Sequence, residues 1–499
     1  MQSRHGRSDM TLGEMLHTQT MRDPEATALI CGDEKISYGD LDESSSLLAC
    51  WLLEQGLQRG DRVAIHWCNS IETVQVFFAA FKAGLIAVPV NLRMKPPEVA
   101  WVLEHSQSAI CFCQPSLAHN VEQAASGSFR AVLTTLPELI TGRASALPLV
   151  GEDEPAVLLY TSGSTSKPKG AIHTHRTLGE ATRLWVENML DPNDVVLIMT
   201  SMVHTTGLGC LLSAIRLWRP AILLPAFDPA ATLDAIECFG CTFALGLPAL
   251  FQFVVDEQVR SPRDTNSLRA VFAGGDRVPV DLQERFAAAC GVPLREGFGM
   301  SETFLVCFNP LYAARPGSMG LPCLEVEVRI TDGAGRDLPE GTTGEMVVRS
   351  PANCIGYWND PSVTEALLRG GWLHTGDLAS RDHEGYLWFQ GRRKEIIVHA
   401  GSNVSPQEVE EALYHHPGVL EAGVTGTPDP VHGERVVAFV SLRKGAALGE
   451  KELRDHLRNW LADYKVPERI LFTTELPKGA TGKIHRLSLK SMVAELVQP

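Results

Sequence analysis

The sequence has 499 residues, of which 44% are hydrophobic and 21% charged, and its net charge is −15. This length predicts more than one domain, and the composition excludes a disordered chain and a small disulfide-bonded scaffold. The acidic balance argues against nucleic acid as a partner, and no apolar run reaches the 18 residues of a membrane span. The first ten residues lack the apolar core of a secretory signal, so we expect a cytoplasmic protein.

The first half of the chain alternates short apolar strands with helical patterns. A helix is predicted over 40–56, a strand over 61–67, a helix over 71–84 and a strand over 85–91. This alternation predicts an α/β fold whose parallel sheet is covered on both faces. Four later apolar runs continue this alternation of strands and helices: 195–201, 221–226, 242–247 and 269–275.

The pattern changes near residue 320. Alternating strands with Gly and Asp turns at 325–332, 344–350 and 385–391 predict a smaller antiparallel β-unit. The charged run that follows Gly391 predicts a hinge, so we expect domains over 1–391 and 392–499. In the second domain, helical patterns at 406–416 and 450–464 flank a strand at 435–442, which predicts a small α+β domain.

Two familiar site types are not supported by the sequence. The C-x-x-C of Cys238 and Cys241 has no second ligand pair for a structural zinc site. The stretches 163–170 and 479–483 contain Gly and Lys but do not match the G-x-x-x-x-G-K-[ST] pattern of a Walker loop.

The strongest functional signal is the segment 161–170, TSGSTSKPKG, which directly follows an apolar strand. It combines five hydroxyl side chains, two lysines and two glycines in ten positions. Backbone N–H groups, hydroxyls and ammonium groups are the donors that hold phosphates. The same composition also suits a polar surface loop, so the loop alone leaves both interpretations open.

This loop resembles the phosphate-binding loop of the adenylate-forming superfamily, which includes acyl-CoA synthetases, adenylation domains and luciferases. Ser166 stands where that motif often has glycine. The other sequence motifs of that family also have counterparts here, in the same order along the chain: 297–303, 372–377, 391–394 and 477–483. The resemblance implies a large N-terminal domain of stacked, mostly parallel sheets in αβαβα layers plus a small β-unit, and a small mobile C-terminal α+β lid domain.

The resemblance also implies a site for ATP. Phe298 would lie against adenine, Ser301 would reach the α-phosphate, and Asp377 and Arg392 would bind the ribose. Glu302 and Thr165 would hold Mg²⁺, which takes oxygen ligands. The implied ATP- and AMP-binding residues are Thr161, Ser162, Gly163, Ser164, Thr165, Lys169, Gly275, Asp276, Arg277, Glu296, Gly297, Phe298, Gly299, Met300, Ser301, Asp377 and Arg392.

The implied reaction has two halves. A substrate carboxylate attacks the α-phosphorus of ATP to give an acyl-adenylate and pyrophosphate, and coenzyme A then takes the acyl group and releases AMP. The catalytic residues would be Lys483, Glu302, Thr165 and His204. Lys483 reaches the site only if the lid closes, Lys394 would be the hinge of its later rotation, and Gly401 would line the passage for coenzyme A.

The acid is expected to be a fatty or aromatic monocarboxylate. The stretch 201–210 has no Asp to pair the ammonium of an amino acid, and Arg277 is the only nearby cation for a second carboxylate. The expected pocket residues are uncharged: Val203, Thr205, Cys210, Leu245, Gly274 and Leu305.

Two alternatives remain open, and the resemblance also allows for a homodimer. One alternative is an adenylation enzyme that loads a carrier protein in trans. The other is a catalytically silent relative that binds ATP, although such a protein is expected to have lost Lys483, Glu302 or Asp377, and all three are present.

Overall fold

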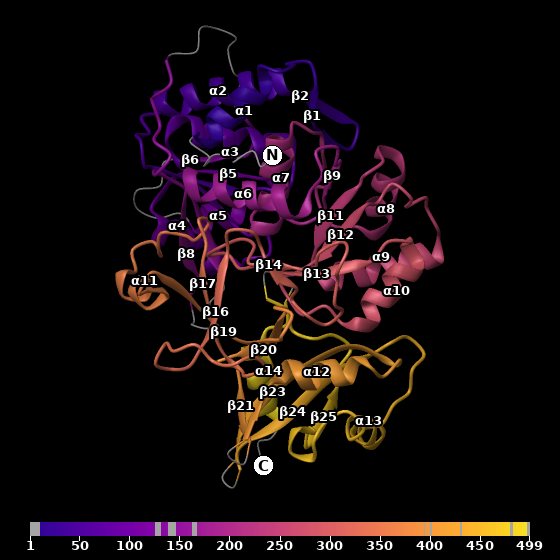
Figure 1. The fold of residues 1–499 in the computed structure, drawn as a ribbon. Coiled ribbons are helices and arrows are strands. Elements are labelled where there is room, and N and C mark those ends of the chain that lie inside the picture. Colours follow the sequence, from indigo (N-terminus) through magenta and orange to yellow (C-terminus); the bar gives the residue numbers. More distant parts are fainter. Residues whose placement is uncertain are drawn as a thin grey trace.

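The computed structural model describes residues 10–124, 131–137, 146–161, 167–393, 395–399, 402–429, 432–479 and 483–496. Strands in these ranges form four sheets. Two belong to the large N-terminal part, a third lies below them, and the fourth lies in the C-terminal part at the bottom of Figure 1.

The first sheet has the strand order β6-β5-β3-β4-β7-β8. Its strands are parallel except for β8, which is antiparallel to β7 and pairs Lys169 with Thr161. The end of β7 and the start of β8 therefore lie side by side at the edge of this sheet. The strands are β3 (Arg62–His66), β4 (Ile86–Pro89), β5 (Ser108–Cys113), β6 (Ala131–Leu133), β7 (Pro155–Thr161) and β8 (Lys169–Thr174).

The second sheet has the order β15-β14-β13-β12-β11-β9-β10-β1-β2. Its central strands are parallel and its two ends are antiparallel. The strands are β1 (Thr27–Cys31), β2 (Glu34–Ser37), β9 (Val196–Ile198), β10 (Ala221–Leu223), β11 (Phe243–Gly246), β12 (Ala270–Ala273), β13 (Leu294–Phe298), β14 (Cys307–Phe308) and β15 (Leu321–Pro322).

Both sheets are covered on both faces, and successive strand residues, which point to opposite sides, are buried in different cores. Val63 and Ile65 join the central core between the sheets, whereas Ala64 joins a core on the outer face. The central layer is formed by α1 (Leu12–Thr20), α2 (Tyr38–Glu54), α3 (Ile71–Ala83), α6 (His175–Met189) and α7 (Thr205–Leu217). The outer layers are α4 (Pro96–Ser106) with α5 (Ala118–Ala124), and α8 (Pro229–Phe239) with α9 (Pro248–Arg260) and α10 (Val280–Cys290). The predicted αβαβα layers are confirmed.

Local signals in the sequence explain the predicted elements. Helix α3 begins after Ser70, whose hydroxyl accepts a hydrogen bond from the backbone N–H of Thr73. It ends at Gly84, which takes the left-handed conformation with a φ of 68°. The predicted helix over 71–84 and the strands on either side of it are confirmed.

The third sheet is the predicted small β-unit, and it is antiparallel. Its elements are β16 (Glu327–Thr331), β17 (Gly344–Arg349), α11 (Pro361–Leu367), β18 (Leu368–Arg369), β19 (Trp372–Arg381) and β20 (Leu387–Arg392). The proposed domain boundary between residues 391 and 392 lies at the end of β20.

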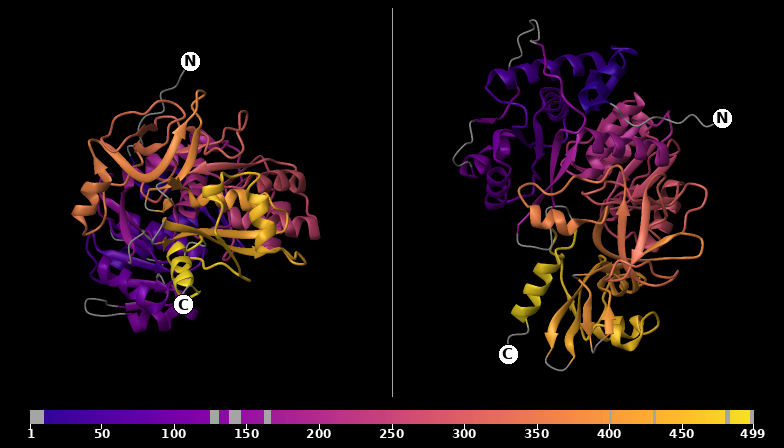
Figure 2. Two further views of the ribbon diagram at one scale, coloured as in Figure 1. Left: turned by 90° about the horizontal axis from the view of Figure 1, so that it is seen from below. Right: turned by 60° about the vertical axis from the view of Figure 1, so that its left-hand side comes forward.

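The fourth sheet, in the C-terminal part, has its own apolar core. It lies below the large part in Figure 1 and in the right-hand view of Figure 2. Its elements are β21 (Ile397–His399), β22 (Ser402–Val404), α12 (Pro406–Tyr414), β23 (Val419–Asp429), β24 (Gly433–Leu442), α13 (Glu450–Leu457), β25 (Arg469–Phe472) and α14 (Arg486–Leu496). None of the helices in the described ranges is long and apolar enough to cross a membrane.

One predicted helix is too long. The pattern over 450–464 is helical only to Leu457 in the structure. Leu461 continues the apolar stripe and is buried, but Ala462 has an extended backbone with a ψ of 147°. This change of direction lets Val466 join the same core. Periodicity alone could not show it, because the stripe itself continues past the end of the helix.

Candidate active site

Several of the predicted site residues follow the carboxyl ends of the parallel strands β12 and β13. Ligands of open α/β sheets bind at this edge. Gly274 and Gly275 follow β12, and the backbone N–H of Gly274 donates to Gly246 O at 3.0 Å. A Cβ on Gly274 would lie 2.6 Å from Gly297 O, so only glycine lets these strand ends approach so closely.

The turn after β13 is tight. A Cβ on Gly299 would lie 1.7 Å from Phe304 O, which explains the glycine in this box. The backbone N–H of Met300 donates to Phe304 O at 3.1 Å, and His173 Nε2 lies 2.7 Å from Ser301 O. His173 stands on β8, so this contact joins the strand after the phosphate-loop segment to the turn that carries Ser301.

Glu302 is buried beside Tyr357. The Tyr357 hydroxyl donates to Glu302 Oε1 at 2.5 Å, and the Lys169 ammonium lies 5.7 Å from the centre of the Tyr357 ring. Burial and then the Glu302 charge raise the pKa of Tyr357 well above its ordinary value, which keeps the phenol a donor. Sequence reasoning missed this role for Tyr357, because 55 residues separate it from Glu302 and no local pattern links them.

Asp377 and Arg392 face each other on neighbouring strands. They are directly opposite in the register of β19 and β20, and Arg392 Nε donates to Asp377 Oδ1 at 3.0 Å. Asp377 is buried, whereas about half of the Arg392 side chain is exposed. Burial raises the pKa of Asp377, and the Arg392 and Lys483 charges oppose that shift. Arg393, the next residue, pairs with the buried Glu345 at 2.7 Å.

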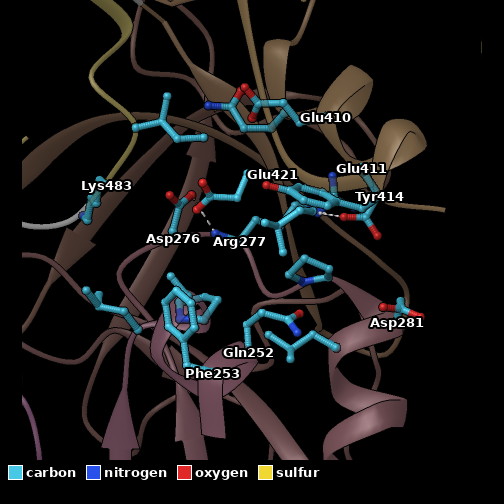
Figure 3. A pocket seen from close by; sticks show the side chains of 18 of the residues that line it. Gln252, Phe253, Asp276, Arg277, Asp281, Glu410, Glu411, Tyr414, Glu421 and Lys483 are labelled. Atoms are coloured by element: carbon cyan, nitrogen blue, oxygen red, sulfur yellow. Dashed lines mark hydrogen bonds and ion pairs between the residues drawn. The ribbon is translucent and has the colours of Figure 1, made fainter. Parts of the chain in front are cut away.

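Lys483 reaches this site from the C-terminal part. A Cβ built on Gly275 would lie 3.6 Å from Lys483 Cε and 3.9 Å from its Nζ. Burial and then the Arg392 charge lower the pKa of Lys483, while the charges of Asp276, Asp377 and Glu302 oppose the shift. Figure 3 shows Lys483 and Asp276 on the same side of a cavity between the two parts. The C-terminal part therefore stands where it brings Lys483 beside Gly275 and Asp276 of the large part.

His204 is the residue before α7 and is held by Asn91. The Nδ2 of Asn91 lies 2.9 Å from His204 Nε2, and since an amide nitrogen only donates, Nε2 accepts and the neutral ring carries its proton on Nδ1. Burial, followed by the Lys483 charge, lowers the pKa of His204 to about 4. No local pattern links His204 to Asn91, because 113 residues separate the two.

The expected acyl-pocket residues are mostly buried and uncharged. Val203, Cys210, Leu245 and Leu305 are buried, and Thr205 and Gly274 are half-buried. Cys210, Leu245 and Leu305 belong to the same central core. A Cβ on Gly297 would meet only ordinary contacts, the nearest at 3.7 Å and Leu305 Cδ1 at 3.9 Å.

Some predicted residues cannot be compared with the structure. Ser162, Gly163, Ser164 and Thr165 of the phosphate loop lie outside the described residues, as do Lys394 and Gly401. Their roles stay predictions.

The donor set fits a magnesium ion that arrives with the nucleotide. Among the residues that the structure describes, no group of three or more His, Cys, Asp or Glu side chains could hold a metal ion. Glu302 offers a single carboxylate, and Mg²⁺ commonly takes one or two carboxylates together with substrate phosphate oxygens. A site with one protein carboxylate therefore suits Mg²⁺ bound to ATP.

Comparison with known proteins decides the family. The model for AMP-binding enzymes matches residues 16–358, and the model for their C-terminal domain matches residues 408–483. The chain belongs to the AMP-binding enzyme family. It is an acyl-CoA synthetase of the adenylate-forming superfamily, as its boxes predicted.

Three relatives illustrate the likeness. A feruloyl-CoA synthase of Amycolatopsis is 36% identical over 467 residues, which cover 92% of this chain and 94% of the relative. A long-chain-fatty-acid–CoA ligase of Bacillus subtilis is 32% identical over 525 residues and covers 96% and 94%. The structure of the anthranilate CoA ligase AuaEII in complex with anthranoyl-AMP has a TM-score of 0.92, 27% identity and complete coverage of both chains.

The buried histidines predict a pH-dependent stability. Burial lowers the pKa of His173 from 6.5 to about 4, so an unfolded chain takes up this proton at a higher pH than the folded chain. The unfolding free energy should therefore fall as the pH drops from 6.5 to about 4, by up to about 3 kcal/mol from this residue. Urea unfolding of the wild type and His173→Gln, followed across this range, measures the difference. Parallel pH profiles of the two proteins would contradict the prediction.

Proposed function

We propose that this acyl-CoA synthetase activates an aromatic or fatty monocarboxylic acid with Mg-ATP and transfers the acyl group to coenzyme A. The observation that carries the proposal is that Val203, Cys210, Leu245 and Leu305, the side chains expected to surround the acid, are all uncharged and buried. A second carboxylate or an ammonium group on the substrate would lie unpaired against this lining, at a large desolvation cost. The feruloyl-CoA synthase and the fatty-acid ligase support the two acid classes.

The proposed roles follow the chemistry of each group. Lys483 brings a positive charge to the α-phosphate, where two anions must meet, and Glu302 holds Mg²⁺ with the nucleotide. Asp377 and Arg392 bind the ribose. His204, neutral near pH 7, orients the substrate carboxylate through its Nδ1 proton. Thr165 and the loop around it bind phosphate oxygens, Lys394 is the hinge, and Gly401 lines the coenzyme A passage.

A panel of acids tests the proposed substrate class. Pyrophosphate release with Mg-ATP should be fastest with hydroxycinnamic, benzoic or fatty acids, and at least about tenfold slower with malonate or with amino acids, because a further charge costs more than about 1.4 kcal/mol. The panel is run with and without coenzyme A, with thioester measured separately. A preference for malonate or an amino acid would contradict the proposed class. Adenylate that forms without passing to coenzyme A would favour a carrier protein as the acceptor.

A further inference from the structure

A cavity of about 160 Å³ lies between the large part and the lid. Its large-part wall includes Arg277, in the segment after β12, and Phe253 of α9. Its lid wall includes Glu411 and Tyr414 of α12. Figure 3 shows Arg277 directed across this cavity toward Glu411, with Lys483 on another side of the same cavity.

Arg277 and Glu411 form an ion pair between the two parts. The Nε of Arg277 lies 3.4 Å from Glu411 Oε2, and the two side chains are 26% and 12% exposed. A charge pair that is mostly shielded from solvent interacts more strongly than one on an open surface. The pair therefore contributes to where the lid sits.

The neighbouring charges make Glu411 the lid partner of Arg277. Glu410, the preceding residue, is occupied by Arg486 within the lid, at 2.5 Å. On the large part, Arg277 also lies near the buried Glu296 and its neighbour Asp276. Glu411 also lies near Glu296, and His415, the residue that follows α12, lies 4.0 Å from it.

The pair is adjacent to the proposed catalytic lysine. Arg277 is two residues after Gly275, against which the Lys483 side chain lies. Holding α12 against this segment therefore also holds the lid where Lys483 lies beside Gly275. We propose that the Arg277–Glu411 ion pair is a positioning contact that holds the lid for adenylation and must open before the thioester step. The inference rests on the proposed role of Lys483.

Neutralising Glu411 tests the inference. Glu411→Gln should slow single-turnover pyrophosphate release about tenfold, using the best acid of the panel, because the lysine is then in place for less of the time. Thioester formation from supplied acyl-adenylate and coenzyme A should keep its rate or rise. The matched control is Glu408→Gln on the same helix, because Glu408 pairs with Lys465 inside the lid at 2.5 Å. This control should leave both half-reactions unchanged.

A double-mutant cycle shows whether the two residues act as a pair. In an Arg277→Gln background, Glu411→Gln should cost nothing further. Full activity of Glu411→Gln in pyrophosphate release, equal slowing of both half-reactions, or additive losses in the cycle would overturn the inference. Lys483→Ala serves as the reference. If Lys483→Ala itself adenylates normally, the proposed role of the lysine is wrong. If Lys483→Ala is inactive and Glu411→Gln adenylates at the wild-type rate, only the positioning contact is refuted.

Discussion

Replacing Lys483 with alanine should slow pyrophosphate release at least about 100-fold, by analogy with the removal of a preorganised donor at a developing charge. The ammonium lies beside Gly275; burial and the Arg392 charge lower its pKa, and the charges of Asp276, Asp377 and Glu302 oppose that shift. The loss should appear in single-turnover adenylation. Thioester formation from supplied acyl-adenylate should change little, because the lysine acts on the phosphate and not on the thiol.

Lys478→Ala is the matched control for this variant. Lys478 stands in the same box, but its ammonium pairs with Glu421 within the lid at 2.7 Å. It should therefore keep adenylation within about twofold, because its charge is paired within the lid and does not lie beside Gly275. Unchanged pyrophosphate release in Lys483→Ala, or an equal loss in Lys478→Ala, would contradict the proposed role.

The change Glu302→Gln should reduce adenylation about 100-fold or more and raise the Mg²⁺ concentration that gives half-maximal rate. The amide keeps the shape of the side chain and can still contact Tyr357, but it removes the negative charge that a hard cation prefers. Titrating the rate with Mg²⁺ at fixed ATP measures both effects.

Tyr357→Phe separates the charge of Glu302 from its orientation. This variant removes the 2.5 Å hydrogen bond and leaves the carboxylate in place. We expect a loss of about tenfold or less, with the Mg²⁺ dependence nearly unchanged. If Glu302→Gln retained the wild-type Mg²⁺ dependence, the proposed metal role would be wrong.

Much of the fold could be predicted because its signals are local. Helix α3 carries its own cap at Ser70 and its own stop at Gly84, and the strands that flank it are short apolar runs. The change to alternating strands near residue 320 marks the antiparallel sheet. The end of α13 could not be predicted, because the apolar stripe runs on to Leu461 while the backbone turns at Ala462.

The site was predictable in a different way. Its boxes could be located one by one, and the glycines at 274 and 299 have a steric reason in the structure. The contacts between boxes could not be located, because they join distant segments. Tyr357 to Glu302, Asn91 to His204 and Arg277 to Glu411 depend on how the sheets and the lid are placed.

The most direct test of the account is the product balance of one reaction. The purified chain is given Mg-ATP and the best acid of the panel, with and without coenzyme A, and AMP, ADP, pyrophosphate and thioester are quantified together. The account predicts a single turnover of pyrophosphate with enzyme-bound acyl-adenylate when coenzyme A is absent. With coenzyme A it predicts AMP, pyrophosphate and thioester in equal amounts. Formation of ADP and phosphate, or thioester without AMP, would contradict it.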